Sequence, residues 1–556
     1  MLNRKSSFFL VLIILIFFLF VIPQLKKPFL NDEFYFINSA KSINEVGYPI
    51  VYDGEQKTEL LGGLHPPFFM HILAISFKLF GSSEIIARLV PVLFAVGTII
   101  LIYLISMEIF KKKENKHTIA LISCLVYVIN PLVIQGSLLI DIDGGLLTFL
   151  MMMLIYTFIK TAGRNYLLLS LIMVVALWAK IQAILFLVPL FLFYLLNKRI
   201  KEGIINLSII GGLSVGTFLV TWFLYSTITP LHFNMPFEHS FGYIQFSKPA
   251  LFDNLLLNIW AIKNMIFWTT PPFLLLVSIA TYQRVKTFLN TKKALYIDLL
   301  LIYGLVILFF FMMINTISYG FPKYLTQMMP LFSILLGHFI ANFRFKSNSK
   351  FPFISIALIL LLFLFHFLVI GDPFIPHNLF YTTSISLGNN LTTYLLSSLH
   401  GSLYLLPILI TFIILLGLRY KFYTSLVLSL IIVLIVSGFY IDYVQSKADY
   451  STIYNYGQEG FLETADYIRA RTTNEDVILA PQVIADYAGR KYYHSFYFDA
   501  GWINFTKTIK ENDLPYLVIA PQNKFEGYHD LYEFRIEIGH FKIYQRKEDL
   551  LPNSIS

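Results

Sequence analysis

The stretch that decides the fold begins NDEFYF (residues 31–36), continues through LHPPFF (64–69) and ends ARLVP (87–91). It lies between the first apolar run of the chain and the second. It carries an acidic pair, a histidine before two prolines and a lone arginine, in a chain that has few charges elsewhere. Ionisable residues beside membrane segments are usually functional. This stretch is therefore the first candidate for a functional site.

The composition indicates the class of protein. The 556 residues are 57% hydrophobic and only 13% charged, whereas a soluble domain has about 25% charged residues. We therefore predict a helical polytopic membrane protein. The net charge of +9 is better explained by basic loops on the cytoplasmic side than by nucleic-acid binding. The single cysteine, Cys124, lies in an apolar run, which excludes an intrachain disulfide and a cysteine-based metal site.

The membrane topology follows from the positive clusters. Arg4 and Lys5 precede the first apolar run, and no small-residue cleavage site follows it, so we expect an uncleaved anchor. Placing the lysine and arginine clusters inside, with about 20 apolar residues per span, gives an odd number of spans and puts the tail after Tyr443 outside. About 13 helices are predicted, at 7–25, 85–110, 117–138, 145–161, 166–179, 181–197, 204–226, 264–282, 295–314, 325–343, 353–370, 403–418 and 424–441.

The first external loop, 25–84, is predicted to lie along the membrane. Counting 66–81 as a span would place the acidic pair and the lysines at 111–113 on the same side. We therefore expect 66–81 to form a helix in the membrane interface. Residues 34–46 have helical spacing of apolar residues and predict a second helix there. Residues 1–443 would thus form the transmembrane domain.

The composition changes after Tyr443, and we predict a small extracytoplasmic α/β domain at 444–556. It contains no glycine-rich phosphate loop and no evident catalytic cluster, so we interpret it as an accessory domain. Its expected elements are a helix at 461–472, buried strands at 476–480 and 515–520, and a closing hairpin of 533–538 with 540–546.

Several motifs together resemble a known family. In order, they are the acidic pair, the long loop, the His-Pro-Pro sequence, an amphipathic segment ending in Phe-Gly, and ARLVPVLFAVGT (87–98). They resemble the protein O-mannosyltransferase and aminoarabinose-transferase superfamily of GT-C glycosyltransferases. Lys180 and PKYLTQMMP (322–330) resemble later landmarks of that family. The resemblance implies a multi-span plasma-membrane enzyme that transfers a sugar from a polyprenyl-phosphate donor to a protein, lipid or glycan acceptor on the outer face.

The chemistry of such a transfer assigns roles to the residues. Inverting transfer needs a carboxylate that takes the proton of the acceptor hydroxyl, and Asp32, beside Glu33, resembles the catalytic carboxylate of the family. Asp141 and Asp143 match its second acidic loop and would position the acceptor or a divalent metal. The departing phosphate needs positive charge and hydrogen-bond donors. The candidates for this site are Lys180, Arg88, His65, Lys323 and Tyr324.

Each assignment has a plainer alternative. The acidic pair could cap a helix, and the two aspartates of LIDIDG (139–144) could belong to an ordinary polar turn. Lys180 and Arg88 could extend to the lipid headgroups, and Lys323 could be an ordinary loop cation. His232, Glu238 and His239 have zinc-ligand side chains, but their spacing is unspecific and we do not predict a zinc site.

Two other classes of function remain open. The first is a lipid or solute transporter or flippase, which typically places ionisable residues within broken helices near the membrane midplane and often contains inverted repeats. Here the charges gather at the predicted external boundary, and the sequence shows no internal repeat. The second is a non-catalytic scaffold whose tail binds a partner.

Overall fold

The fold is taken from a computed structural model. It describes residues 4–29, 32–53, 56–58, 65–242, 268–313, 323–343, 423–447, 460–494, 505–512, 514–520 and 528–547.

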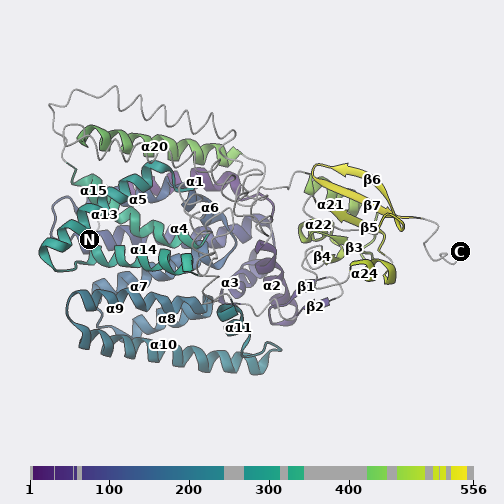
Figure 1. Ribbon diagram of the computed structural model, residues 1–556, viewed down its shortest axis with the longest axis horizontal. Helices are drawn as coiled ribbons and strands as arrows, with labels where there is room; N and C mark the ends of the chain where they lie inside the picture. The colour runs from purple at the N-terminus through teal and green to yellow at the C-terminus, as the bar shows by residue number, and fades with distance from the viewer. Residues whose placement is uncertain are drawn as a thin grey trace, which may run out of the picture.

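Most of the chain forms a body of helices that lie side by side (Figure 1). Within a bilayer, a helix satisfies its own backbone hydrogen bonds, so long apolar runs fold in this way. The long helices are α1 (Arg4–Val21), α4 (Glu84–Ile109), α5 (Lys116–Val128), α7 (Leu147–Thr161), α8 (Tyr166–Ala179), α9 (Leu187–Leu196), α10 (Ile200–Ile228), α13 (Pro271–Thr291), α14 (Tyr296–Met313), α15 (Met329–Ala341) and α20 (Tyr423–Lys447). Shorter helical segments are η1 (Ile22–Gln24), α6 (Pro131–Leu138), η3 (Ile142–Leu146), η4 (Ile181–Phe186), α11 (Met235–Gly242) and η5 (Lys323–Met328).

The helices confirm a membrane protein. The described residues contain six helices that are long and apolar enough to cross a bilayer, or seven if α5 and α6 count as one span bent by 67°. The bend lies where Pro131 starts α6 and Asn130 caps it. The spans predicted up to 343, and 424–441, fall on helices of this body, while 353–370 and 403–418 lie outside the described residues. The total of 13 spans stays a prediction.

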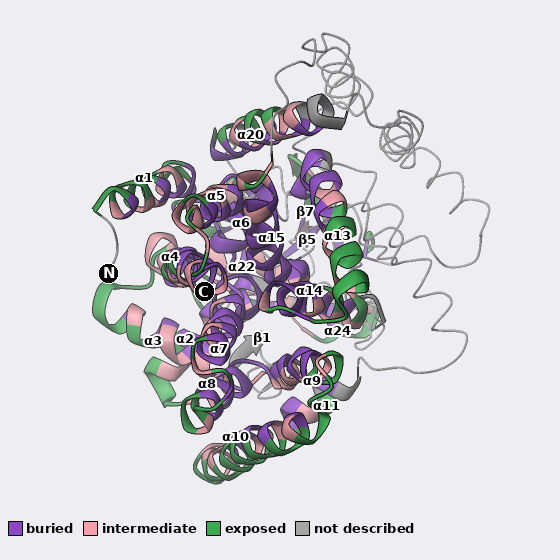
Figure 2. Ribbon diagram, turned by 90° about the vertical axis from the view of Figure 1, so that its left-hand side faces the viewer, coloured by how far each residue is buried: buried purple, intermediate pink, exposed green. Residues whose placement is uncertain are grey.

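The outer surface of the helical body is apolar. Figure 2 shows exposed residues along the outward sides of α1 and α10, around buried central helices such as α6 and α15. On α10, the exposed side chains include Val220, Phe223 and Ile228. Such a surface is suited to contact with lipid tails rather than with water.

The first loop contains the two helices expected there, α2 (Asp32–Val46) and α3 (Phe68–Phe80), with a short hairpin of β1 (Val51–Asp53) and β2 (Gln56–Thr58) between them. One face of α3 is buried and packs on α2, where the rings of Phe36 and Phe69 meet edge to face at 5.6 Å. Other apolar side chains of α3, Leu79 and Phe80 among them, are exposed. Both helices therefore have the amphipathic character that the sequence predicts.

The C-terminal part contains a five-stranded sheet in the order β4-β3-β5-β7-β6. Strands β3 and β5 and the antiparallel hairpin β6–β7 occur where the sequence predicts them. Parallel pairing of β4 with β3 is an additional feature. The elements are α21 (Phe461–Arg469), β3 (Val477–Ala480), α22 (Gln482–Ala488), β4 (Lys491–His494), α24 (Phe505–Glu511), β5 (Tyr516–Ile519), β6 (Tyr532–Ile538) and β7 (Phe541–Arg546), which we call the C-terminal sheet unit.

The C-terminal sheet unit contacts the first loop, at one end of the helical body (Figure 1). The hydroxyl of Tyr487 accepts a hydrogen bond from the Phe29 backbone N–H at 2.7 Å, and the Asn38 amide donates to Asp486 at 3.3 Å. The first loop and the tail therefore lie on the same side of the helices. Which side is external stays a prediction.

This shared side is testable by cysteine labelling. Lys41 on α2 and Lys491 on β4 are exposed, and the exposed Lys111 follows the far end of α4. We expect Lys41→Cys and Lys491→Cys to react with an impermeant thiol reagent in intact cells, and Lys111→Cys to react only after permeabilisation. The buried Cys124 should contribute little background. Labelling of Lys111→Cys together with either of the other two in intact cells would contradict the topology.

The contact also predicts a pH dependence of stability. Burial of Asp486 against α2 raises its pKa from 3.8 to about 6, although Asn38, Lys41 and Gln482 partly offset this effect. A raised carboxyl pKa means that the folded state holds a proton that the unfolded state has lost, so stability falls as the pH rises from about 4 to 6. The measurement is the thermal unfolding temperature in detergent as a function of pH. The Asp486→Asn variant should not lose stability between about pH 4 and 6 in the way that the wild type does. Parallel pH profiles for the two proteins would contradict the assignment.

Candidate functional site

The site begins with a buried ion pair between Glu33 on α2 and Arg88 on α4. Both side chains are about 99% buried, and two hydrogen bonds of 2.6 and 2.9 Å join them. The remaining N–H groups of Arg88 donate to the backbone carbonyls of Lys27, Pro28 and Leu138. A guanidinium has five N–H donors, so all of them are used within the protein. In this arrangement none remains for the lipid phosphate expected from the sequence.

Glu33 also joins α2 to the second acidic loop. Its Oε1 accepts a hydrogen bond from the Ile140 backbone N–H at 3.2 Å, and Ile140 directly precedes Asp141. The two acidic segments, more than 100 residues apart in the chain, therefore meet at this point. Asp32 is the first residue of α2. Its side chain, like Asn31, lies outside the described part of the structure, so the helix-cap alternative stays open.

A second group of charges lies around Asp141 and Asp143. Lys323 donates to Asp141 at 2.7 Å, and Lys180 donates to both oxygens of Asp143 at 2.8 and 2.7 Å. The ring of Tyr324 lies near both ammonium groups, 4.7 Å from Lys180 and 5.4 Å from Lys323. We call these five residues the Asp–Lys cluster.

Local backbone geometry brings the cluster together. Lys180 is an extended residue between α8 and η4, which breaks what could otherwise be one long helix. Asp141 caps the π-helical turn η3 by accepting from the Asp143 N–H. Two glycines let η3 approach its neighbours: a Cβ on Gly144 would lie 2.1 Å from the Gly136 carbonyl oxygen, and one on Gly145 would lie 2.8 Å from that of Pro91.

The burial of these groups argues against the plainer alternatives for them. Asp141, Asp143, Lys180 and Lys323 are all at least 93% buried. The lysines therefore do not extend to headgroups, and LIDIDG is not an exposed turn. Charges at such depth are stable only when paired and hydrogen-bonded, which is the arrangement observed here. His65, half-buried before α3, keeps its phosphate role as a prediction.

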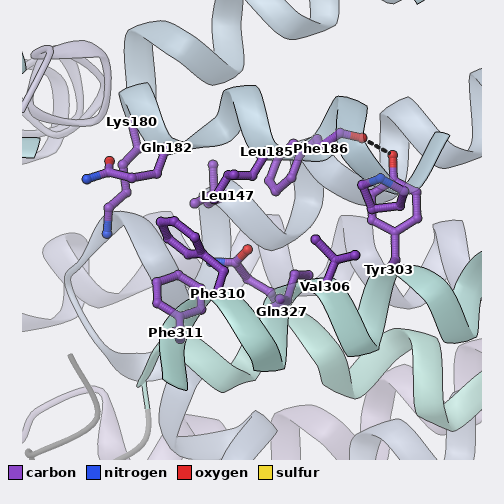
Figure 3. A pocket seen from close by; sticks show the side chains of 12 residues that line it. Leu147, Lys180, Gln182, Leu185, Phe186, Tyr303, Val306, Phe310, Phe311 and Gln327 are labelled. Atoms are coloured by element: carbon purple, nitrogen blue, oxygen red, sulfur yellow. Dashed lines mark hydrogen bonds between the residues drawn. The ribbon is translucent and has the colours of Figure 1, made fainter. Parts of the chain in front are cut away.

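An apolar pocket begins at the cluster. Figure 3 shows Lys180 and Gln182 at one end and Tyr303 at the other, where its hydroxyl donates to the Phe186 carbonyl at 2.6 Å. The walls between them are formed largely by leucine, isoleucine, valine and phenylalanine side chains of η4 and α14. The pocket thus has apolar walls and a cation at one end.

Two glutamines in this pocket were missed by the sequence analysis. Gln182 Oε1 and Gln327 Nε2 are buried and have no hydrogen-bond partner among the described residues. Buried polar atoms normally have partners, so both are suited to a bound ligand. Each glutamine lies in a mostly apolar run close to a lysine that the sequence predicts to bind phosphate: Gln182 is near Lys180, and Gln327 is near Lys323. This proximity is the signal that could have identified them.

The described residues do not favour a metal at the cluster. Over these residues, no three His, Cys, Asp or Glu side chains gather as a metal site would require. Asp141 and Asp143 each face a lysine ammonium. A positive charge at those oxygens disfavours a divalent cation there.

Comparisons with known proteins show which family and which folds this chain resembles. Residues 64–224 match the family described as dolichyl-phosphate-mannose-protein mannosyltransferase. The structure of ArnT from Cupriavidus metallidurans bound to undecaprenyl phosphate superposes with a TM-score of 0.61 at 16% identity, over 98% of each chain. The resemblance to the GT-C superfamily is confirmed. The archaeal oligosaccharyltransferase AglB from Archaeoglobus fulgidus, in complex with an inhibitory peptide and a dolichol-phosphate, has a TM-score of 0.50 at 12% identity, over 99% of this chain and 75% of that chain.

The sequence likeness to these GT-C proteins is local. Dolichyl-phosphooligosaccharide-protein glycotransferase 1 of Archaeoglobus fulgidus is 37% identical over 98 residues, which are 17% of this chain and 16% of that protein. The match thus spans about one sixth of that curated relative. At such low identities, the superpositions show the GT-C fold alone. The family match includes Arg88 and Lys180 but ends before Lys323 and begins after the acidic pair.

The Lys180–Asp143 pair provides a test of the cluster. Lys180→Met would leave a buried carboxylate without its cation, and breaking such a pair typically costs about 3–5 kcal/mol. We expect a clear loss of thermal stability in detergent, and recovery of much of it when Asp143→Asn is added. Lys111→Met removes an exposed lysine and is the matched control. A Lys180→Met variant as stable as the wild type would show that the pair is not formed.

Proposed function

We propose that this chain is a membrane glycosyltransferase that transfers a sugar from a polyprenyl-phosphate donor to an acceptor hydroxyl, on the outer face and with inversion. The acceptor oxygen forms a bond to the anomeric carbon, and the bond from that carbon to the phosphate oxygen breaks. The polyprenyl phosphate leaves with the electron pair, and a carboxylate takes the acceptor proton. We prefer a glycosyltransferase to a transporter because the site offers both a candidate base and candidate phosphate-binding cations.

The single observation that carries this proposal is the double contact of Glu33. It binds Arg88 and also accepts from the Ile140 N–H. It thereby brings the start of α2, and with it the Asp32 backbone, to the loop that leads into the Asp–Lys cluster. The acidic pair thus lies next to the loop whose two aspartates bind the two lysines. This is the combination that transfer from a lipid phosphate requires.

In this proposal, Glu33 and Asp32 have different roles. Glu33 is committed to Arg88 and to the backbone, so it positions the first turn of α2. Asp32 is its neighbour in the chain, and successive residues of a helix differ in direction by about 100°, so the two carboxylates are not expected to share one role. We assign Asp32 as the general base and Arg88 as the residue that holds the acidic pair in place.

The donor would bind at the cluster and pocket. Two observations support such a donor. The matching family is described as a dolichyl-phosphate-mannose-protein mannosyltransferase, and the similar ArnT and AglB structures hold undecaprenyl phosphate and a dolichol-phosphate. Lys180 donates two hydrogen bonds, both to Asp143, so its third N–H would face the phosphate. Lys323 and Tyr324 would line the phosphate with it, and His65 would contribute from the loop. Asp141 and Asp143 would orient the lysines, and the apolar chain would occupy the pocket of Gln182 and Gln327.

The assignment of the base is tested by Asp32→Asn. Asparagine keeps the size of the side chain but cannot accept a proton. A general base contributes about 10² to 10⁴ in rate, so transfer should fall by that factor while the protein remains folded and still binds the lipid-linked sugar. The assay uses purified protein with a panel of polyprenyl-phosphate sugars and reads the products by mass spectrometry. Glu45→Gln, an exposed carboxylate at the other end of α2, is the matched control.

The outcomes separate the classes of function. An active Asp32→Asn variant means that Asp32 is not the base. Wild-type protein that moves lipid-linked sugar between leaflets of vesicles, without forming a product on any acceptor, would instead support a flippase. The acceptor, whether protein, lipid or glycan, is identified by the product that appears in the same assay.

A further inference from the structure

The C-terminal sheet unit extends one side chain, Tyr487 of α22, into the network behind the acidic pair. Its hydroxyl accepts from the Phe29 N–H at 2.7 Å and donates to Glu84 Oε1 at 3.1 Å. These partners are more than 400 residues away in the chain. A hydroxyl has one donor and two acceptor positions, so the single O–H bridges two separate segments.

Both of these segments are linked to Arg88. Phe29 follows Pro28, whose carbonyl accepts from Arg88 at 2.8 Å. Glu84 begins α4, the helix that carries Arg88 one turn later on the same face. The tyrosine therefore joins the helix that carries Arg88 to the segment that accepts from its guanidinium. A displacement of either segment would shift the first turn of α2.

The ring of Tyr487 is fixed as firmly as its hydroxyl. It packs edge to face on Phe34, the third residue of α2, at 5.9 Å, and lies 5.9 Å from Phe461 of α21. The backbone carbonyl of Tyr487 accepts a hydrogen bond from Arg469. The sheet unit thus presents this side chain in one orientation, directly against the helix that begins at Asp32.

We propose that Tyr487 is a positioning residue for the acidic pair, and that the C-terminal sheet unit sets the geometry of the base from outside the helical body. This inference rests on the proposed function, because it concerns the same Asp32. It assigns a role in the reaction to a part of the chain in which the sequence predicts no catalytic cluster. In this proposal the tyrosine is not a catalytic residue but acts through Phe29, Glu84 and the first turn of α2.

The test uses the full-length protein and steady-state kinetics. Tyr487→Phe keeps the ring and removes both hydrogen bonds. A slightly misplaced catalytic group costs up to about 100-fold in rate, so kcat should fall by about ten-fold or more, with the KM for the lipid-linked donor unchanged. Tyr467→Phe is the matched control, since Tyr467 lies on α21 and stacks on Arg471. It should behave as the wild type.

A second measurement separates positioning from general destabilisation. In an Asp32→Asn background, the base no longer exists, so Tyr487→Phe should cause no further loss of transfer. A residue that merely supports the fold would reduce both backgrounds by the same factor, because effects of independent residues add in free energy. Equal losses in both backgrounds, an unchanged kcat, or a change confined to KM would each overturn the proposal.

Variants of Glu84 keep the test valid if Tyr487→Phe does not fold. Glu84→Gln retains an oxygen acceptor for the tyrosine hydroxyl and should keep kcat near the wild-type value, whereas Glu84→Leu should lower it. Equal kcat values for these two variants would contradict the role of the contact. Failure of the proposed function is recognised separately, because Asp32→Asn alone would then remain active whatever the result for Tyr487.

Discussion

The buried ion pair of Arg88 and Glu33 is the contact on which the rest of the site depends. The guanidinium joins four pieces of chain: its own helix, the segment after η1, the start of α2 and the end of α6. Removing a charge from water is costly, and the cost is recovered only if every donor and acceptor finds a partner. Arg88 meets that condition because all five of its N–H groups have partners. These hydrogen bonds restrict how the four pieces of chain can be arranged.

The Asp–Lys cluster follows the same rule with a different consequence. Its two lysines pair with its two aspartates, so the charges within the cluster balance each other. Such a site avoids the large cost of an unpaired charge beside the bilayer. Lys180 nevertheless lies at the end of an apolar pocket, which also contains two glutamines, each with one amide atom that lacks a partner among the described residues. A ligand with a phosphate and an apolar chain would match both halves of this environment.

The contact of the C-terminal sheet unit with the first loop links the two ends of the chain. Tyr487 packs on Phe34 of α2 and Asp486 accepts from Asn38, while Glu33 of the same helix binds Arg88, so α2 contacts both the sheet unit and the helical body. The bounds of α20 show that the helix continues to Lys447, slightly past the domain boundary predicted at residue 443. The sheet unit is therefore connected to a membrane helix as well as packed on the first loop.

The sequence by itself determined the class of the protein, the two helices of the first loop, the C-terminal hairpin and most residues of the candidate site. These features depend on local properties. Hydropathy, the spacing of apolar residues and rare charges can be recognised in the sequence without knowledge of distant contacts. Only the tertiary structure decided how the charges pair. Glu33 faces Arg88, Asp143 faces Lys180 and Asp141 faces Lys323, at separations of 55, 37 and 182 residues. It also placed Gln182 and Gln327 in one pocket with Lys180, and Tyr487 against α2, because burial and partnership arise when separate segments pack together.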